Sequence, residues 1–185
     1  TNHGLADMAA RSDLSYNSLK RVSQNFLRPE TLQQANQIIV DATAQLPMFT
    51  HYNIKSDTLH SSSDGQKFTT RFDTVNARHS NKYFGLEKGI SNLTMALNHV
   101  PVNTKTIGSN EYEGHYVLDI LDSNKTSIQP TIHSTDSHGT NKVNFALLDF
   151  FGYQFAPRYK QFPKETTNLV GFKSPDAYPE KYIIK

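Results

Sequence analysis

The first fifty residues carry apolar side chains at the spacing of α-helices. Leu19, Val22 and Phe26 recur at intervals of three and four residues, and this pattern ends at the Arg28-Pro29 pair. A second helix is expected to begin at that proline, which is tolerated in the first helical turn, and to end at Pro47. Its predicted apolar face consists of Leu32, Ala35, Ile38, Ile39, Ala42 and Leu46.

From Ser56 onward the pattern changes to that of strands. Residues 58–63 are expected to form one strand, and the alternation of apolar and polar residues over 68–73 predicts a second, half-buried one. A short strand is predicted at 82–85. A longer strand is expected at 93–100, where a proline closes it.

Helices and strands alternate in the following part of the chain. Asn110 and Glu113 have the spacing of a capping box, which predicts a helix starting here. Residues 128–135 are expected to form the next strand. The helix predicted to start at Asn110 has its apolar positions at Tyr112, Tyr116, Val117, Ile120 and Leu121.

The last regular pattern is an apolar helix followed by a short strand. Asn141 is a suitable N-cap for a helix over 143–151, which is apolar nearly all round and is therefore expected to be buried. Gly152 ends it, and residues 153–156 form the final predicted strand. If the short strand at 82–85 is left aside, the order is three main strands, a helix, a strand, a helix and a strand. This is the opening order of an RNase H-like α/β fold, in which the first and fourth strands are neighbours.

The fold class predicted is therefore an RNase H-like mixed sheet flanked by helices, incomplete in this chain and preceded by a helical segment. With 185 residues, the chain has room for one domain with a helical preface. Residues 1–52 are assigned to that preface, and residues 53–185 to the front part of the RNase H-like domain.

Composition narrows the chemistry that is available. The chain has no cysteine, which excludes disulfides, thiolate zinc sites and cysteine nucleophiles. Its formal charge of +2 is compatible with a polyanionic partner without being a signature of one. We expect no signal peptide, no membrane span and no secretion. The absence of an initial methionine predicts a fragment of something longer.

Two stretches of the chain have the same arrangement of residue types. Asp64 and Asp136 each follow a short Ser/Thr-rich strand and each lie close to a glycine, at which the first strand is expected to break. Two strand-borne aspartates that meet at a sheet edge suit a divalent-metal site for phosphoryl transfer. Taken singly, an Asp beside a Gly is also a common turn.

The order of short motifs resembles one family, the replicative DDE transposases of the large Tn-three type. The two aspartates also stand 72 residues apart, as the resemblance requires. The similarity extends over nearly the whole chain. It is carried by residues 28–32, 46–47, 62–68, 77–80, 82–85, 135–139, 147–151 and 152–158.

This resemblance implies an enzyme that nicks transposon ends and joins the 3′-hydroxyls to target DNA. It implies two divalent ions, Mg²⁺ or Mn²⁺, on three carboxylates, of which Asp64 and Asp136 match the first two. The third, a glutamate, is expected beyond residue 185, so that this chain alone is expected to be inactive. The partners implied are transposon-end and target DNA, with self-association of the full-length protein in the bacterial cytoplasm at the nucleoid.

Several basic and polar residues are candidates for contacts with DNA. Gln66 and Lys67 directly follow the first acid, and Arg158 and Lys160 end the last predicted strand. Arg78 is added because it lies in a motif that matches the family. For each of these residues, an ordinary solvated surface position is the alternative.

Zinc is an alternative reading of the second acidic stretch. His133, Asp136 and His138 are zinc-ligand types, but the first two do not share a face of a strand, and a further ligand would have to come from elsewhere. Asp149 lies in the apolar helix and is interpreted as structural, although it is the acid most in need of checking near the site.

Two other functions remain open from sequence. A stand-alone RNase H-like metal nuclease would need a third acid within the chain, and Glu165, Asp176 and Glu180 stand among prolines and aromatic residues that do not indicate a helix. A non-catalytic DNA-binding or assembly module would retain the fold without the chemistry. The presence of both aspartates argues against that module.

Overall fold

A computed structural model describes residues 4–54 and 58–166 of the chain. As expected, the first fifty residues are helical. Pro47, however, does not merely follow the preceding helix, because it occupies the first turn of a further one. The four N-terminal helices are α1 (Leu5–Ala10), α2 (Tyr16–Phe26), α3 (Pro29–Ala44) and α4 (Pro47–His51).

Helix α3 packs against the domain through a different side from the one predicted. The side chain of Asn36 donates to the carbonyl of Val102, Gln37 donates to that of Lys125, and Val40 is fully buried. Ile38 and Ile39, on the predicted apolar face, are 70% and 62% exposed. The prediction of this face was wrong because polar side chains that satisfy backbone carbonyls decide how the helix docks.

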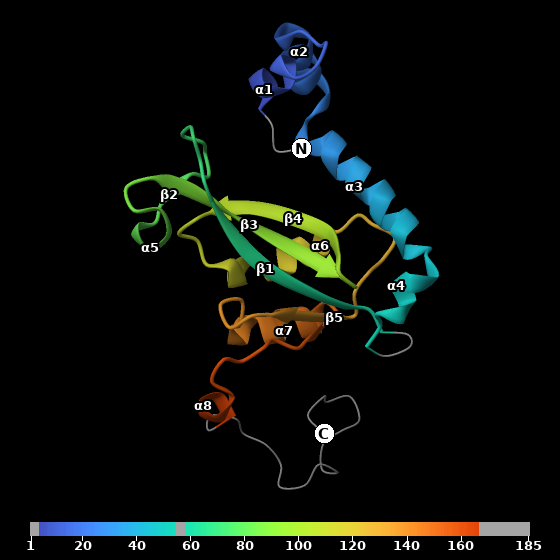
Figure 1. Ribbon diagram of the computed structural model, residues 1–185. Coiled ribbons are helices and arrows are strands. Elements are labelled where there is room, and N and C mark those ends of the chain that lie inside the picture. Colours follow the sequence, from blue (N-terminus) through green and yellow to red (C-terminus); the bar gives the residue numbers. More distant parts are fainter. Residues whose placement is uncertain (1–3, 55–57, 167–185) are drawn as a thin grey trace, which may run out of the picture.

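The sheet is mixed and follows the predicted RNase H-like order. Its main path runs β2, β3, β1, β5, β6, and β4 also pairs with β3. Figure 1 shows β1 to β5. β3 pairs antiparallel with both β1 and β4, whereas β5 pairs parallel with β1 and β6. The strands are β1 (His60–Thr69), β2 (Arg78–His79), β3 (Lys88–Leu97), β4 (Val100–Gly108), β5 (Ile132–Thr135) and β6 (Gln154–Phe155).

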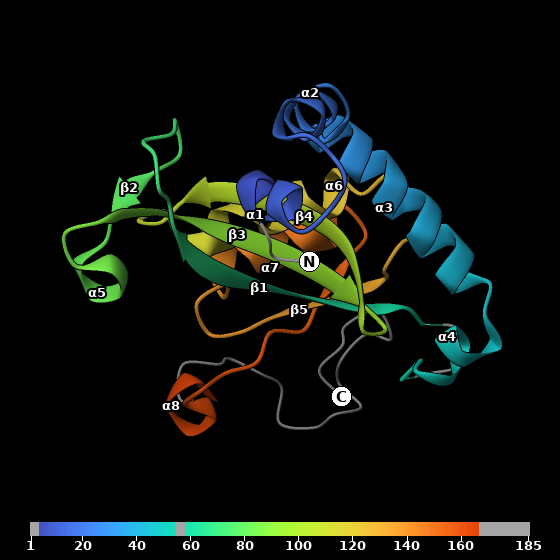
Figure 2. The same cartoon turned by 45° about the horizontal axis from the view of Figure 1, so that its top comes forward.

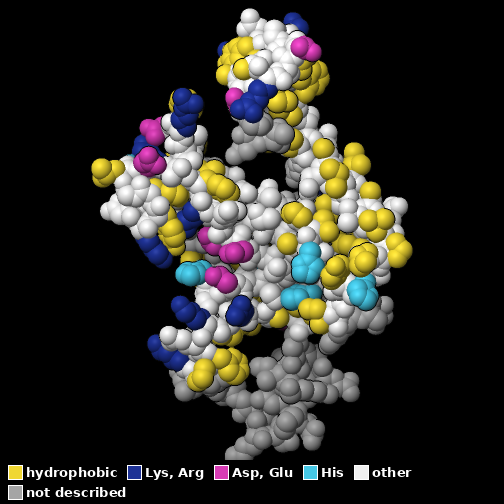
Figure 3. All heavy atoms as spheres, viewed as in Figure 1, with side chains coloured by type: hydrophobic (Ala, Val, Ile, Leu, Met, Phe, Trp, Pro, Cys, Tyr) yellow, Lys and Arg dark blue, Asp and Glu magenta, His cyan; other side chains and the backbone are white. Residues whose placement is uncertain are grey.

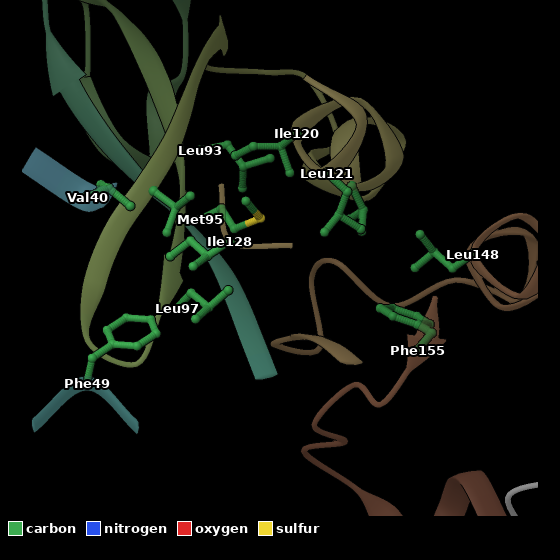
Figure 4. Close-up of a cluster of buried hydrophobic side chains, with 12 residues drawn as sticks. Val40, Phe49, Leu93, Met95, Leu97, Ile120, Leu121, Ile128, Leu148 and Phe155 are labelled. Carbon is green, nitrogen blue, oxygen red and sulfur yellow. The ribbon is translucent and has the colours of Figure 1, made fainter. Parts of the chain in front are cut away.

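One face of this sheet carries the core. Helices α6 (Val117–Asp122) and α7 (Lys142–Phe150) lie behind the sheet in Figure 2. Figure 4 shows Leu93 and Met95 of β3 directed toward Ile120 of α6, within a cluster of buried apolar side chains. The opposite face of β1 carries no helix in Figure 1. Ser62, Asp64 and Gln66 of that face are exposed.

Strand β1 does not break at its glycine. It pairs with β3 without interruption from Ser61 to Thr69, so Gly65 lies inside a strand of ten residues. Of the second strand predicted over 68–73, only Phe68 and Thr69 belong to β1, and residues 70–73 lie beyond it and form no strand. Local turn chemistry predicted a break, but continuous pairing with a neighbouring strand overrode it.

Two further predictions in the middle of the chain were wrong. Residues 82–85 contain a short helix, α5 (Asn81–Phe84), and the strand predicted at 93–100 is a hairpin. Asn98 and His99 have φ of 47° and 67° and form its two-residue turn. Pro101 lies within β4, which is an edge strand where proline is tolerated.

The helices of the second half were predicted in the right places, with differences in detail. A 3-10 turn (Glu113–Tyr116) precedes α6, and no capping box forms there. Asn141 caps α7, as expected, by accepting from the backbone N–H of Asn144. Helix α7 is not buried all round: in the described structure only one side packs on the sheet, and Phe150 is 84% exposed.

The remaining element is the short helix α8 (Phe162–Thr166). Asp176 and Glu180 fall outside the described residues, as does the side chain of Glu165. Within the described part of the chain, no helix combines the length and apolar character needed to cross a membrane.

Candidate active site

The pairing of β1 with β5 brings the two predicted acids side by side. The last registered pair of this parallel ladder is Ser63 with Thr135, both buried. Asp64 and Asp136 are the next residue on each strand. Because side chains alternate between faces and neighbouring strands lie about 4.8 Å apart, the two carboxylates start from adjacent positions on the open face.

Both acids line one surface hollow of about 510 Å³. Figure 3 shows a small group of acidic side chains near the middle of this face, with Lys and Arg side chains on the flanking lobes. The lining residues of the hollow include four acids and Lys67. Its other lining residues are Gly65, Gln66, Lys67, Tyr83, Glu111, Tyr112, Glu113 and His138.

The Asp136 carboxylate is held by the loop that follows it. Its Oδ1 accepts from the backbone N–H groups of His138, at 2.8 Å, and Gly139, at 3.2 Å. Its Oδ2 lies 2.9 Å from the ring Nδ1 of His138. Burial alone would raise the pKa of Asp136, but these bonds outweigh it and leave the pKa below its ordinary value. Asp136 is therefore ionised at neutral pH.

Asp64 is less constrained. It is exposed, and its Oδ1 accepts from the backbone N–H of Gly65 at 2.8 Å. The adjacent glycine matters for a different reason from the one expected: a side chain at position 65 would collide with the carboxylate of Glu113. Gly65 thus allows a second acidic side chain to approach the strand directly behind Asp64.

Glu113 is a site residue that the sequence assigned to a helix cap. Its Oε1 accepts from the hydroxyl of Ser91 at 3.1 Å and lies 3.7 Å from the amine of Lys67. Both members of this ion pair are mostly buried. The available sequence signal was the position of Lys67, two residues after Gly65, which places both residues on one face of a strand. Nothing in the sequence identified Glu113 as the partner of Lys67.

The amine of Lys67 is held by the protein itself. Besides Glu113, it donates to the carbonyl of Ser109 at 3.0 Å and lies 4.9 Å from the centre of the Tyr83 ring. Its stem and amine therefore form one wall of the hollow. A contact between Lys67 and DNA stays a prediction.

The other predicted DNA contacts are spread over the surface around the hollow. Gln66 is exposed on the same face of β1 as Asp64 and lines the hollow. Arg158 is exposed, and Lys160 lines a smaller hollow of about 260 Å³ that includes Ser137, next to the second acid. Arg78 donates to the carbonyls of its own loop and does not line either hollow.

The zinc reading does not fit the geometry. Both ring nitrogens of His133 are bonded to serines of β1 on the buried face, whereas His138 lies on the open side with Asp136. Across residues 4–54 and 58–166, no three His, Cys, Asp or Glu side chains are grouped as metal ligands. Asp149 is exposed on α7 and does not line the hollow.

The strand order and the paired acids place the chain in the class of RNase H-like α/β proteins. A family model described as "Tn3 transposase DDE domain" matches residues 1–184. The chain belongs to this family, as the motifs of its sequence indicated.

Curated relatives are transposases from several bacteria. The chain is 28% identical over 159 residues to the transposase for transposon Tn4556 of Streptomyces fradiae, an alignment that covers 85% of this chain and 18% of that protein. It is 30% identical over 180 residues to the transposase for transposon Tn501 of Pseudomonas aeruginosa, covering 96% and 18%. For the gamma-delta transposase of Escherichia coli K12, identity is 30% over 146 residues, covering 78% and 14%. The chain spans less than a fifth of the length of these relatives.

Solved structures show a more distant similarity. The piggyBac transposase synaptic complex with hairpin DNA covers 90% of this chain and 40% of its own, with a TM-score of 0.44 and 14% identity. The Mos1 strand transfer complex covers 94% and 63%, with a TM-score of 0.36 and 13% identity.

The close approach at Gly65 generates a first prediction. Gly65→Ala is expected to displace the Glu113 carboxylate and lower the free energy of unfolding by about 1–3 kcal/mol, because a mostly buried, charge-assisted bond is lost. In a Glu113→Ala background the same substitution should cost much less. Urea denaturation of the four chains of this double-mutant cycle measures the difference. Equal costs in both backgrounds would show that Glu113 is not what the added methyl meets.

The buried histidine generates a second prediction. Burial, and secondarily the charge of His60, lowers the pKa of His133 from 6.5 to about 4. Between these values the unfolded chain binds more protons than the folded one, so the free energy of unfolding falls as pH drops from 6.5 to 4. The expected loss is about 3 kcal/mol.

Urea denaturation at pH 7, 5 and 4 tests this loss. The matched control is His133→Phe, which retains the ring but cannot titrate. The pKa of His60 is also lowered by burial, so the control should keep a part of the pH dependence. Identical slopes for both chains would refute the assignment to His133.

Proposed function

We propose that this chain is the front part of the catalytic domain of a DNA transposase, which nicks transposon ends and joins the 3′-hydroxyls to target DNA. The observation that carries the proposal is the register of β1 and β5, which sets Asp64 beside Asp136 in a chain of the Tn3 transposase DDE domain family. The proposed substrates are transposon-end and target DNA. The setting proposed is the bacterial cytoplasm at the nucleoid, with self-association of the full-length protein.

The two carboxylates fit divalent metal. Mg²⁺ is commonly bound by one or two carboxylates and keeps waters and phosphate oxygens as its other ligands, and both acids open onto a hollow with room for these. Asp64 and Asp136 would hold Mg²⁺ or Mn²⁺. When bound, such ions activate the attacking oxygen and stabilise the leaving one.

The chain's own residues prepare this site. The loop amides and His138 keep Asp136 charged and fixed in orientation, while Asp64 has a single bond from the next backbone N–H. The Lys67–Glu113 ion pair lines the hollow beside the acids, and its two opposite charges largely cancel. Gln66 on this face, and Arg158 and Lys160 near the second acid, are proposed to contact the phosphate backbone of DNA, with Arg78 further away.

A stand-alone nuclease is less well supported. The other acids that line the hollow are Glu111 and Glu113, and each is already bonded within the protein. Glu111 accepts from the backbone N–H of Gly108 and from the Tyr116 hydroxyl. The third metal-binding carboxylate is therefore proposed to come from a later part of the parent protein.

The two acids give a prediction about the parent transposase. Asp64→Asn or Asp136→Asn should reduce strand transfer by about a thousandfold or more, because the amide retains the shape of the side chain but loses its charge. Binding of transposon-end DNA should stay within about twofold, since phosphate and base contacts lie elsewhere. Asp149→Asn is the control, because that acid is exposed on α7. Strand transfer above a tenth of wild type in the Asp64 variant would overturn the proposal.

The isolated chain gives another prediction. The purified 185-residue protein should show no Mg²⁺- or Mn²⁺-dependent nicking of a labelled transposon-end duplex, because two carboxylates are too few to hold two ions. The Asp64→Asn chain is run beside it. Nicking by the native chain that the variant lacks would mean that an acid within these residues completes the site.

A further inference from the structure

His133 lies between two serines of the neighbouring strand. Its Nδ1 is 2.8 Å from the hydroxyl oxygen of Ser61, and its Nε2 is 3.0 Å from that of Ser63. The ring is fully buried on the core face of the sheet, directly behind the strand ends that carry the two aspartates. The same face places Met95 and Leu97 of β3 opposite these serines.

The polar groups of Ser61, Ser63 and His133 are all hydrogen-bonded in one protonation state of the imidazole. Its burial keeps the imidazole neutral at pH 7, so one ring nitrogen donates and the other accepts. The hydroxyl of Ser61 donates to the carbonyl of Ile132 at 3.4 Å and can therefore accept from Nδ1–H. The hydroxyl of Ser63 then donates to Nε2. Every polar atom of the three side chains has a partner in this arrangement.

The arrangement is specific to the observed register. If β5 shifted by two residues along β1, His133 would face Gly65 and Ser63 in one direction, or Leu59 and Ser61 in the other. In either case one buried ring nitrogen would lose its hydroxyl partner, which is unfavourable. A shift by one residue would place the inward-facing residues of β5 beside the outward-facing residues of β1.

Most other contacts of β5 are backbone hydrogen bonds, a kind that the slipped pairings could form as well. β5 has four residues, all paired with β1, and two of them pair with β6. On the open face, the ring of His60 bonds to the hydroxyl of Ser134, which donates to the carbonyl of Ala156. A short parallel ladder with small polar side chains is weakly specified by apolar packing.

We infer that His133 is a positioning residue: by bridging Ser61 and Ser63 it sets the register of β5 on β1 and so holds Asp136 beside Asp64. The inference rests on the proposed function of the two acids. His133 itself touches neither substrate nor metal. Its contribution is to exclude the slipped pairings that would separate the carboxylates by about two residues, or roughly 7 Å.

The test removes the bridge without leaving polar groups unpaired. The variant His133→Leu/Ser61→Ala/Ser63→Ala replaces all three side chains by apolar ones, which can leave stability nearly unchanged. Strand transfer by the parent transposase carrying these changes should fall by about 100-fold in kcat, with KM for DNA unchanged, because misplaced acids impair chemistry more than binding.

A readout of register that does not depend on activity accompanies it. The 185-residue chain has no cysteine, so Ser62→Cys and Ser134→Cys create a unique pair at registered positions on the open face. Oxidation should form the disulfide readily when the bridge is intact, and about fivefold more slowly in the triple variant. Gln66→Cys with Ser134→Cys is the out-of-register control, and it should not form a disulfide in the native background.

A matched control separates positioning from general destabilisation. Asn103 of β4 is also buried, and its amide donates to the carbonyl of Ile120 and the hydroxyl of Ser123. Strands β3 and β1 lie between β4 and β5. Asn103→Ala should lower stability without changing disulfide formation between positions 62 and 134. If Asn103→Ala slowed this disulfide as much as the triple variant does, positioning by His133 would be refuted.

The outcomes distinguish this inference from the proposed function. A folded triple variant with wild-type disulfide formation and wild-type strand transfer would overturn the role of His133, even if Asp64→Asn is inactive. Full activity of Asp64→Asn would instead overturn the proposed function. If the triple variant does not fold, Ser61→Ala/Ser63→Ala is measured in its place, and wild-type disulfide formation there likewise overturns the inference.

Discussion

The parallel pairing of β1 with β5 is the contact on which the rest of the site depends. It joins segments that are 72 residues apart in sequence, and the hairpin of β3 and β4, helix α6 and a loop lie between them. The hairpin and α6 form the core that supports β1 from behind. The pairing itself is short and largely polar, which is why one buried imidazole between two hydroxyls has a large effect on where the strand ends meet.

The site places like charges close together and compensates each of them differently. Asp136 receives three hydrogen bonds from its own loop, while Asp64 stays exposed to solvent. Glu113, which approaches the strand through Gly65, is balanced by Lys67. Among the described acids that line the hollow, only Glu113 has a lysine partner, while Glu111 is held by neutral donors and the two strand-end carboxylates face the open side.

The described domain also exposes several large apolar side chains on its helices. Ile38 and Ile39 on α3, and Phe150 on α7, project into solvent. The relatives are more than five times as long as the aligned segment, so much of a whole protein of this family lies outside it. Both helices carry the apolar residues that the sequence indicated, but an apolar pattern alone does not say whether a face meets this domain or another part of a longer protein.

The sequence by itself determined the helical start, the change to strands after it, the alternating helices and strands of the second half, and the two candidate acids with their spacing. These features depend on local sequence or on the order of motifs along the chain, and hydrophobic periodicity and motif order encode them directly. Tertiary structure alone decided that β1 runs through Gly65, that Glu113 joins Lys67 rather than capping a helix, and that His133 faces two serines. Each of these depends on a contact between segments distant in the chain, and such contacts leave no periodic signal in either segment. The sequence therefore named Asp64 and Asp136 as candidate acids, whereas their alignment was decided by the packing of β5 on β1.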